Sequence, residues 1–292
     1  MRNNSNRLVA SSPQDGDLSA QMLSQNKEII SVDSEGIFSF TTPTEFVELP
    51  SKGRYYPEGH ILHNVESLEI RFMTAKDEDI LTSKSLIKQG VVIDRLVDNL
   101  LVDKRVKASV MLSGDKNAIL VAARATAFGS EYITKMTCPS CNYVSDYTFD
   151  LAEIQPKEIP DLEQLGVEET EDGTFVFKTP KTNVEVEIKI LSSKEEAEIV
   201  QSMDKRSKKG LPESALTTLL SSIIVSVNGV TNKVQLFQFV ENLPTQDSRH
   251  IKNVYQKILP SLDMRQQFAC PNCSFNQEVD IPITVDFFWS DR

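Results

Sequence analysis

Two tetrapeptides, Cys138-Pro139-Ser140-Cys141 and Cys270-Pro271-Asn272-Cys273, decide how this chain folds. They hold all four cysteines of the 292-residue sequence. The spacing of a Cys-x-x-Cys pair lets both sulfurs reach one ion, and zinc prefers a tetrahedron of four such soft ligands. We therefore predict one zinc ion per chain, bound by Cys138, Cys141, Cys270 and Cys273.

Strand-like sequences lie on both sides of each cysteine pair. Residues 132–137 and 143–151 flank the first pair, and residues 265–269 and 275–281 flank the second. A strand, a cysteine turn and a returning strand form one half of a zinc ribbon. The segment between the pairs is far longer than the ~12–20 residues of a compact ribbon. We therefore predict a split zinc-ribbon-like element, residues 137–151 and 264–292, interrupted by a folded insertion.

The residue after each cysteine pair is the place where ribbons commonly use glycine. Asn142 and Ser274 stand there instead. Asparagine tolerates a positive φ, so Asn142 is a small departure from the ribbon pattern.

A closed set of four thiolates leaves no position for a water ligand, so the expected site is structural and not catalytic. Two other uses of the cysteines stay open, a pair of redox dithiols and disulfide bonds. The N-terminus is polar and lacks the apolar core of a signal peptide, which favours a cytosolic setting. Cysteine pairs in the cytosol bind metal more often than they form disulfides.

The remaining sequence divides around this element. Residues 1–34 are rich in Ser, Asn, Gln and Asp and predict a flexible N-terminal arm. Residues 35–136 predict a mixed N-terminal domain of strands and helices, and residues 152–263 predict a hairpin and a mostly helical insertion. The expected fold class is thus α+β.

Periodicity and capping signals predict the individual elements. A short strand or a docking peptide is expected at residues 36–40, a strand at residues 68–73, and a hairpin at 174–178 and 184–190. Helices are expected from Thr74 to Gly90, over 91–101, over 116–128 with Gly114 or Asp115 as cap, over 193–209 with a Ser193–Glu196 capping box, and over 213–227, 234–240 and 245–259.

The overall charge argues against a nucleic-acid partner. The chain has 31 Lys and Arg against 42 Asp and Glu, a formal net charge of −11, whereas neutralising a phosphate backbone needs a basic face. The basic run Lys205–Lys209 is interpreted as a solvated helix end before Gly210. No apolar run approaches the ~18 residues of a membrane span.

Enzyme signatures are not found in the sequence. It contains no glycine-rich phosphate loop, no Gly-x-Ser-x-Gly and no His-Glu-x-x-His. With only three histidines in the sequence, a catalytic triad is not favoured. His60 and His63 are the only other ligand-like pair, and we expect them to be unliganded surface histidines in a loop or strand. The prediction is a protein that is not an enzyme and has no small-molecule substrate.

Four blocks of sequence resemble a known family. They are Leu49-Pro50-Ser51-Lys52-Gly53-Arg54-Tyr55-Tyr56-Pro57, the Met73–Thr82 helix start, Gly114-Asp115 with its alanine-rich helix through Phe128-Gly129 and Tyr132, and the first cysteine pair. In this order they are similar to the T-even-type bacteriophage baseplate hub assembly family, over residues 46–151. The half of the chain with the second cysteine pair looks like the rest of the longer members.

The resemblance implies a non-enzymatic protein of a contractile phage tail, located in the virion tail baseplate and, during assembly, in the host cytoplasm. Its partners would be other baseplate and tail hub proteins. Whether it is a permanent hub component or an assembly factor stays open, and the family offers no catalytic residues to carry over. The alternative is a zinc-ribbon adaptor of cellular nucleic-acid machinery, although Asp146, Asp150, Glu278 and Asp280 beside the cysteine pairs do not favour it.

Overall fold

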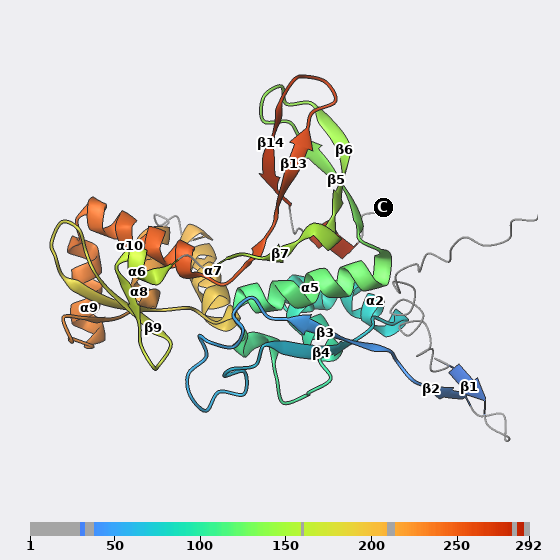
Figure 1. The fold of residues 1–292 in the computed structure, drawn as a ribbon, viewed down its shortest axis with the longest axis horizontal. Coiled ribbons are helices and arrows are strands. Elements are labelled where there is room, and N and C mark those ends of the chain that lie inside the picture. Colours follow the sequence, from blue (N-terminus) through green and yellow to red (C-terminus); the bar gives the residue numbers. More distant parts are fainter. Residues whose placement is uncertain (1–29, 33–37, 159–160, 209–213, 282–284, 289–292) are drawn as a thin grey trace, which may run out of the picture. The chain divides into compact units, whose positions relative to one another are not determined.

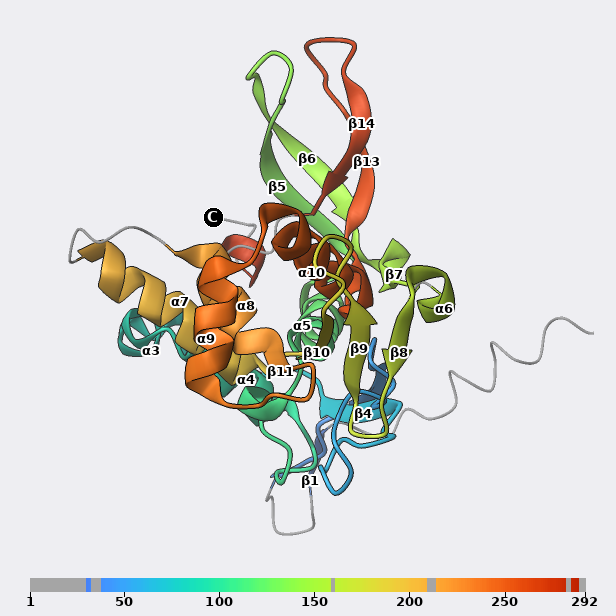
Figure 2. The same cartoon turned by 90° about the vertical axis from the view of Figure 1, so that its left-hand side faces the viewer.

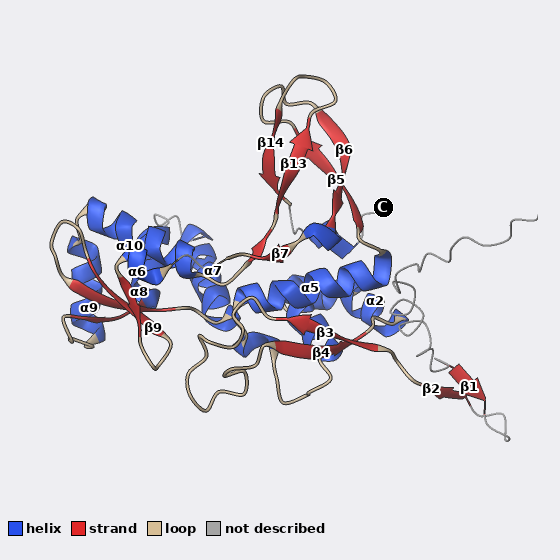
Figure 3. Ribbon diagram, in the orientation of Figure 1, coloured by secondary structure: helices blue, strands red, loops and turns tan. Residues whose placement is uncertain are grey.

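The computed structural model of the chain describes residues 30–32, 38–158, 161–208, 214–281 and 285–288. The chain divides into two compact units, Met1–Pro43 and Thr44–Arg292, and each is described by itself. Helices and several small antiparallel sheets occur together (Figure 3), so the predicted α+β class is confirmed. None of the described helices is both long and apolar enough to cross a membrane.

One short hairpin represents the first unit among the described residues. Strand β1 (Ile30–Val32) pairs antiparallel with β2 (Phe38–Phe40). The strand predicted over residues 36–40 is found at Phe38–Phe40, and residues 36 and 37 lie outside the described part. Of the predicted arm, residues 1–29, 33 and 34 lie outside the described part, and Ile30–Val32 form a strand.

The second unit begins with a hairpin that has one buried face. Strands β3 (Thr44–Glu48) and β4 (Ser67–Arg71) pair antiparallel. Val47, Leu68 and Ile70 are buried between more exposed neighbours, as the alternation of side chains along a strand requires. The helices that follow are α2 (Ala75–Thr82), α3 (Lys84–Gln89), α4 (Val92–Leu100) and α5 (Ser113–Phe128), with a 3₁₀ turn η2 at Ala108–Val110 before α5.

The helix predicted from Thr74 to Gly90 is two helices. Thr74 caps the first, and its backbone N–H donates to the Asp77 carboxylate at 2.8 Å. Ser83 is extended, with φ −66° and ψ 103°, and ends α2 before α3 begins. Serine competes with the helix for backbone hydrogen bonds, which explains a break here. Gly90 ends α3 in the left-handed conformation, as predicted.

Both cysteine pairs lie at the turns of hairpins, and the strands predicted around them are confirmed. Strand β5 (Glu131–Thr137) pairs with β6 (Val144–Asp150), and β13 (Arg265–Ala269) pairs with β14 (Asn276–Asp280). The two hairpins lie side by side in Figures 1 and 2, although the long segment from β6 to β13 separates them in the sequence.

A short ladder closes the segment between the hairpins at its base. Strand β7 (Gln155–Pro156) pairs antiparallel with β12 (Leu262–Asp263), and the Lys157 N–H donates to the Ser261 carbonyl at 2.8 Å. Gly114 in α5 lies against this base, since a Cβ there would come within 1.9 Å of the Pro260 carbonyl oxygen. The two ends of the intervening segment are therefore held together beneath the hairpins.

The intervening segment contains more strand than predicted. Its sheet has the order β11-β10-β9-β8 and is antiparallel. The strands are β8 (Val167–Glu169), β9 (Thr174–Lys178), β10 (Glu185–Lys189) and β11 (Ile224–Val227). The helices are α6 (Leu162–Leu165), α7 (Ser193–Lys208), α8 (Ala215–Ile223), α9 (Lys233–Asn242) and α10 (Thr245–Ile258). The hairpin β9–β10 is confirmed and helices make up most of the regular structure of this segment, but the sequence did not predict β8 or β11.

The helix predicted over residues 213–227 is wrong in its second half. Helix α8 ends at Ile223, and Ile224–Val227 forms β11, the edge strand beside β10. Residue 213 lies outside the described part. A short apolar run rich in β-branched residues suits a buried strand as well as a helix, so periodicity did not separate the two.

The capping box of α7 lies one residue earlier than predicted. Ser192, not Ser193, donates its N–H and its hydroxyl to the Glu195 carboxylate, both at 2.9 Å. Glu196 instead accepts a hydrogen bond from the Ser113 hydroxyl and so links α7 to α5. At the other end of the helix, Lys205–Lys208 are exposed, as expected for a solvated end, and residues 209 and 210 lie outside the described part.

The sequence suggested Gly114 or Asp115 as the cap of α5, but the N-cap is Leu112. The Asp115 carboxylate is fully buried and accepts hydrogen bonds from the Ser51 N–H (2.9 Å), the Ser51 hydroxyl (2.6 Å) and the Tyr56 hydroxyl (2.7 Å). The Tyr56 oxygen in turn accepts from the Leu112 N–H at 2.9 Å. Burial raises the pKa of Asp115, although these donors oppose the shift. The network fastens the loop after β3 to the start of α5.

We expect Asp115→Ala to lower the free energy of unfolding by about 3 kcal/mol, because it leaves the buried donors of Ser51 and Tyr56 without an acceptor. Urea denaturation of the full chain measures this. The matched control is Asp79→Ala at an exposed position in α2, expected to change stability by less than about 0.5 kcal/mol. Equal stability of the two variants would contradict the role given to the network.

Candidate metal centre

The turn of each hairpin is shaped by backbone hydrogen bonds. The Cys138 N–H donates to the Tyr143 carbonyl and the Asn142 N–H donates to the Cys138 carbonyl, both at 2.9 Å. The Cys270 N–H makes the equivalent bond to the Phe275 carbonyl at 2.9 Å. Asn142 has a φ of 56°, which confirms that an asparagine fills the glycine position of the first turn.

The four cysteines, predicted from spacing alone, meet at the ends of the two hairpins. Their Sγ atoms all lie within 4.8 Å of one another. The Sγ atoms of Cys138 and Cys273 are 3.8 Å apart, and those of Cys141 and Cys270 are 3.7 Å apart. A tetrahedron with zinc–sulfur bonds of about 2.3 Å has edges of about 3.8 Å. All four are free thiols, so this arrangement can hold one metal ion.

The cluster of sulfurs rests on a small apolar core of its own. Cys138 and Phe268 are fully buried and Cys270 is 8% exposed. Around them pack the half-buried side chains of Met136, Tyr147, Cys273, Phe275 and Val279, of which Met136, Tyr147 and Val279 also pack against the main core of the second unit. This cluster has one fully buried aromatic ring, so we expect the ends of the two hairpins to need a further link.

Backbone and amide N–H groups point at the sulfurs. The Asn272 N–H donates to Cys270 Sγ at 3.4 Å, and the Asn272 side-chain amide donates to Cys141 Sγ at 3.7 Å. The backbone N–H of Tyr143 lowers the pKa of the Cys141 thiol to about 6. Such donors favour the thiolate form, which is the form that binds a metal.

The last thiol of the cluster has the opposite tendency. The Phe275 N–H lowers the pKa of Cys273, but burial and the neighbouring sulfurs outweigh it and raise that pKa to about 11. Four thiolates at this spacing repel one another, and a divalent cation would remove that repulsion. The donor set therefore suits a cation.

Polar contacts below the cysteines hold the two hairpins side by side. The Gln266 side chain accepts from the Asp150 N–H at 3.1 Å and donates to the Asp150 carbonyl at 2.5 Å. The Tyr147 hydroxyl donates to the Gln267 carbonyl at 2.9 Å. Sequence reasoning missed these residues, and an ordinary polar residue in a strand gives no local signal for such a contact.

His60 and His63 do not join the cysteines. His60 Nδ1 accepts from the Leu62 N–H at 3.1 Å, and its ring stacks on Tyr56 with centroids 4.7 Å apart. His63 Nδ1 lies 2.7 Å from the Tyr56 carbonyl oxygen. Both belong to the loop between β3 and β4, where the sequence placed them.

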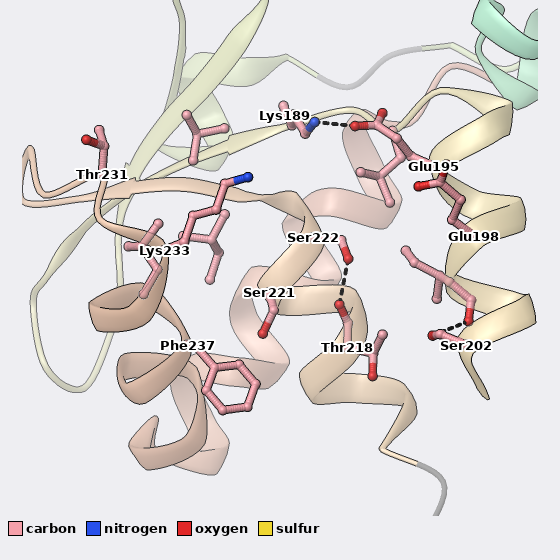
Figure 4. Close-up of a pocket in the computed structure, with 15 residues that line it drawn as sticks. Lys189, Glu195, Glu198, Ser202, Thr218, Ser221, Ser222, Thr231, Lys233 and Phe237 are labelled. Carbon is pink, nitrogen blue, oxygen red and sulfur yellow. Dashed lines mark hydrogen bonds and ion pairs between the residues drawn. The ribbon is translucent and has the colours of Figure 1, made fainter. Parts of the chain in front are cut away.

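A separate groove of about 680 Å³ lies among α7, α8, α9 and β11 (Figure 4). Lys189 and Glu195 form an ion pair along it. The Ser202 hydroxyl donates to the Ile199 carbonyl at 2.7 Å, and the Ser222 hydroxyl donates to the Thr218 carbonyl at 2.8 Å. The described residues that line the groove include no Cys or His, so they form no nucleophile and imidazole pair.

Comparison with known proteins matches residues 42–289 to the family described as T4 bacteriophage base plate protein. This match covers most of the chain and confirms the resemblance seen in the sequence blocks. No curated protein and no solved structure matches the chain.

We expect Cys270→Ser to abolish stable metal binding, because a serine hydroxyl is a poor ligand in a soft thiolate site. Elemental analysis of the dialysed full chain should find about one metal ion per wild-type chain and under about a tenth of that in the variant. Ser274→Ala, an exposed substitution in the same turn, is the control and should keep the metal. Metal retained by Cys270→Ser would contradict the assignment.

Proposed function

Because this chain belongs to the T4 bacteriophage base plate protein family, we propose that it is a non-enzymatic structural or assembly protein of the tail baseplate hub. It binds other baseplate and tail hub proteins, in the virion baseplate and in the host cytoplasm during assembly. The family match over residues 42–289 is the observation that carries this proposal. The order of the four sequence blocks before Cys141 supports the narrower assignment to the hub.

The proposed cofactor is one structural zinc ion per chain, bound by Cys138, Cys141, Cys270 and Cys273. Spacings of 3.7 and 3.8 Å between sulfurs support tetrahedral coordination. Four protein ligands fill such a site, so the ion stabilises structure and has no position for a substrate or a reactive water. The two hairpins, residues 137–151 and 264–292 in the predicted division, then act as one zinc-ribbon-like element.

In this proposal the zinc ion fixes the direction in which the double hairpin leaves the main core. The base is fixed by the β7–β12 ladder and the end by the metal. Near the cysteines the strands have few apolar partners, since Phe268 is the one fully buried aromatic side chain of the cluster around Cys138 and Cys270, whereas Tyr132 and Phe149 near the base belong to the main core. A rigid projection is useful in an assembly protein because its partners then meet a surface of fixed orientation.

The alternative role, a zinc-ribbon adaptor for nucleic acid, is not supported by charge. Acidic residues outnumber basic ones on the two hairpins and the short strand beside them. The acidic residues are Glu131, Asp146, Asp150, Asp263, Glu278 and Asp280, and the basic residues are Lys135 and Arg265. Phosphate groups would be repelled by this surface.

Elemental analysis should find zinc, at about one ion per purified chain, and thiol titration under native conditions should find no reactive cysteine. Chelation followed by unfolding should release about four thiols. A metal-free protein with reactive thiols would support the redox alternative instead. Oxidised, unreactive cysteines would support disulfides.

Mass spectrometry of phage particles and of assembling baseplates tests the proposed location. A hub component is expected in purified virions, and an assembly factor is expected only in baseplate intermediates from infected cells. Virion tail-fibre proteins serve as the control for recovery. A chain missing from both fractions, while tail hub proteins are recovered, would refute the baseplate role.

A further inference from the structure

Each hairpin has one strand next to the other hairpin and one strand on the outside. The Gln266 side chain bonds both backbone groups of Asp150 in β6, and Tyr147 of β6 bonds the Gln267 carbonyl in β13. Strands β6 and β13 therefore face each other. Strands β5 and β14 are the outer edges of the pair.

The outer edge of β5 offers a row of backbone groups for pairing. Hydrogen bonds from the Leu151 N–H to the Ser130 carbonyl and from the Cys138 N–H to the Tyr143 carbonyl fix the alternation along the hairpin. By that alternation the N–H and C=O groups of Glu131, Ile133, Lys135 and Thr137 point away from β6. None of them has a hydrogen-bond partner among the described residues.

Strand β5 carries few of the features that protect an edge. It runs seven residues in unbroken register, without proline or bulge. Native proteins block edges of this length with charge, bulges, proline or a cover, because a bare edge recruits another strand. The side chain of Ile133 is 44% exposed on this strand. The edge of β14 differs, since its outward residues include Glu278 and Asp280.

Side chains along the β5 edge are self-complementary. Glu131 and Lys135 are exposed and lie two positions to either side of Ile133, on the same face of the strand. In an antiparallel pair of two β5 strands centred on Ile133, each Glu131 lies opposite the Lys135 of the other copy. Ile133 meets its own counterpart at the centre.

We propose that β5 pairs with β5 of a second copy of this chain, antiparallel and centred on Ile133. The result is a continuous four-stranded sheet in the order β6-β5-β5-β6 across a two-fold axis. Such an interface is isologous, because the same residues serve on both sides. It goes beyond the baseplate role and does not depend on it.

Charge selects the register. Centring the pair on Glu131 or on Lys135 would place like charges directly opposite, which destabilises a sheet. Only the register centred on Ile133 puts Glu131 opposite Lys135 twice. An antiparallel pair of two β14 strands centred on Glu278 would set two carboxylates opposite each other, which disfavours that pairing.

A ladder of this length buries less surface than a standard stable interface. We therefore expect a weak dimer, with a dissociation constant between about 10 µM and about 500 µM. Such an affinity leaves the free chain monomeric when dilute and lets it pair where copies are concentrated by an assembly.

Sedimentation equilibrium of the full zinc-loaded chain, at concentrations up to about 1 mM, tests the proposal. The wild type should show a monomer–dimer equilibrium. Lys135→Glu and Glu131→Lys should each weaken the dimer at least about tenfold, and the double variant should return to within about threefold of wild type. Within the hairpin, Glu131 lies opposite Asp150 and Lys135 lies opposite Asp146, so the double variant still has one acidic and one basic residue opposite these two aspartates.

Backbone pairing is tested by Ile133→Pro, with Ile133→Val as its control. Proline removes an N–H that points outward, so bonds within the hairpin are kept and the melting temperature should change little. The proline variant should be monomeric and the valine variant should still dimerise. A wild type that stays monomeric to about 1 mM, or a dimer that the charge and proline variants leave unchanged, would overturn the proposal.

Discussion

The meeting of four cysteine sulfurs from two distant parts of the chain is the constraint on which this structure depends. Cys138 and Cys273 come within 3.8 Å only if the long segment between the pairs returns to its starting point. The β7–β12 ladder and the contact of Gly114 with Pro260 achieve this return at the base. The intervening sheet and helices can then fold as an insertion between the two hairpins without disturbing them.

The main core is built on different interactions. Asp115 binds the loop after β3 to the start of α5, and Glu196 binds α7 to the same turn through Ser113. Apolar residues from both halves of the second unit join one continuous cluster. The double hairpin contributes Tyr132 and Phe149 to that cluster near its base, and its outer part packs around Phe268. We therefore expect stability to be unevenly distributed, with a large main core and an outer part of the projection that depends on the cysteines.

Local patterns predicted the parts of the structure that local physics determines. The cysteine spacing predicted that the four sulfurs would come together, and the flanking alternation predicted β5, β6, β13 and β14. The sequence did not reveal contacts between distant polar residues, such as Asp115 with Ser51 or Gln266 with Asp150, because each is unremarkable in its own segment. The run at Ile224–Val227 became a strand because β10 offered an open edge, and no window of sequence contains that information.

Amide hydrogen exchange on the full chain, with metal and after chelation, tests most directly whether the cysteine cluster supports the projection. The account predicts that chelation removes protection from the amides of β5, β6, β13 and β14 while those of α5, β9 and β10 keep theirs. Unchanged protection in the hairpins would contradict it, because the apolar cluster around Phe268 would then be sufficient. Loss of protection throughout the chain would contradict the independence of the main core.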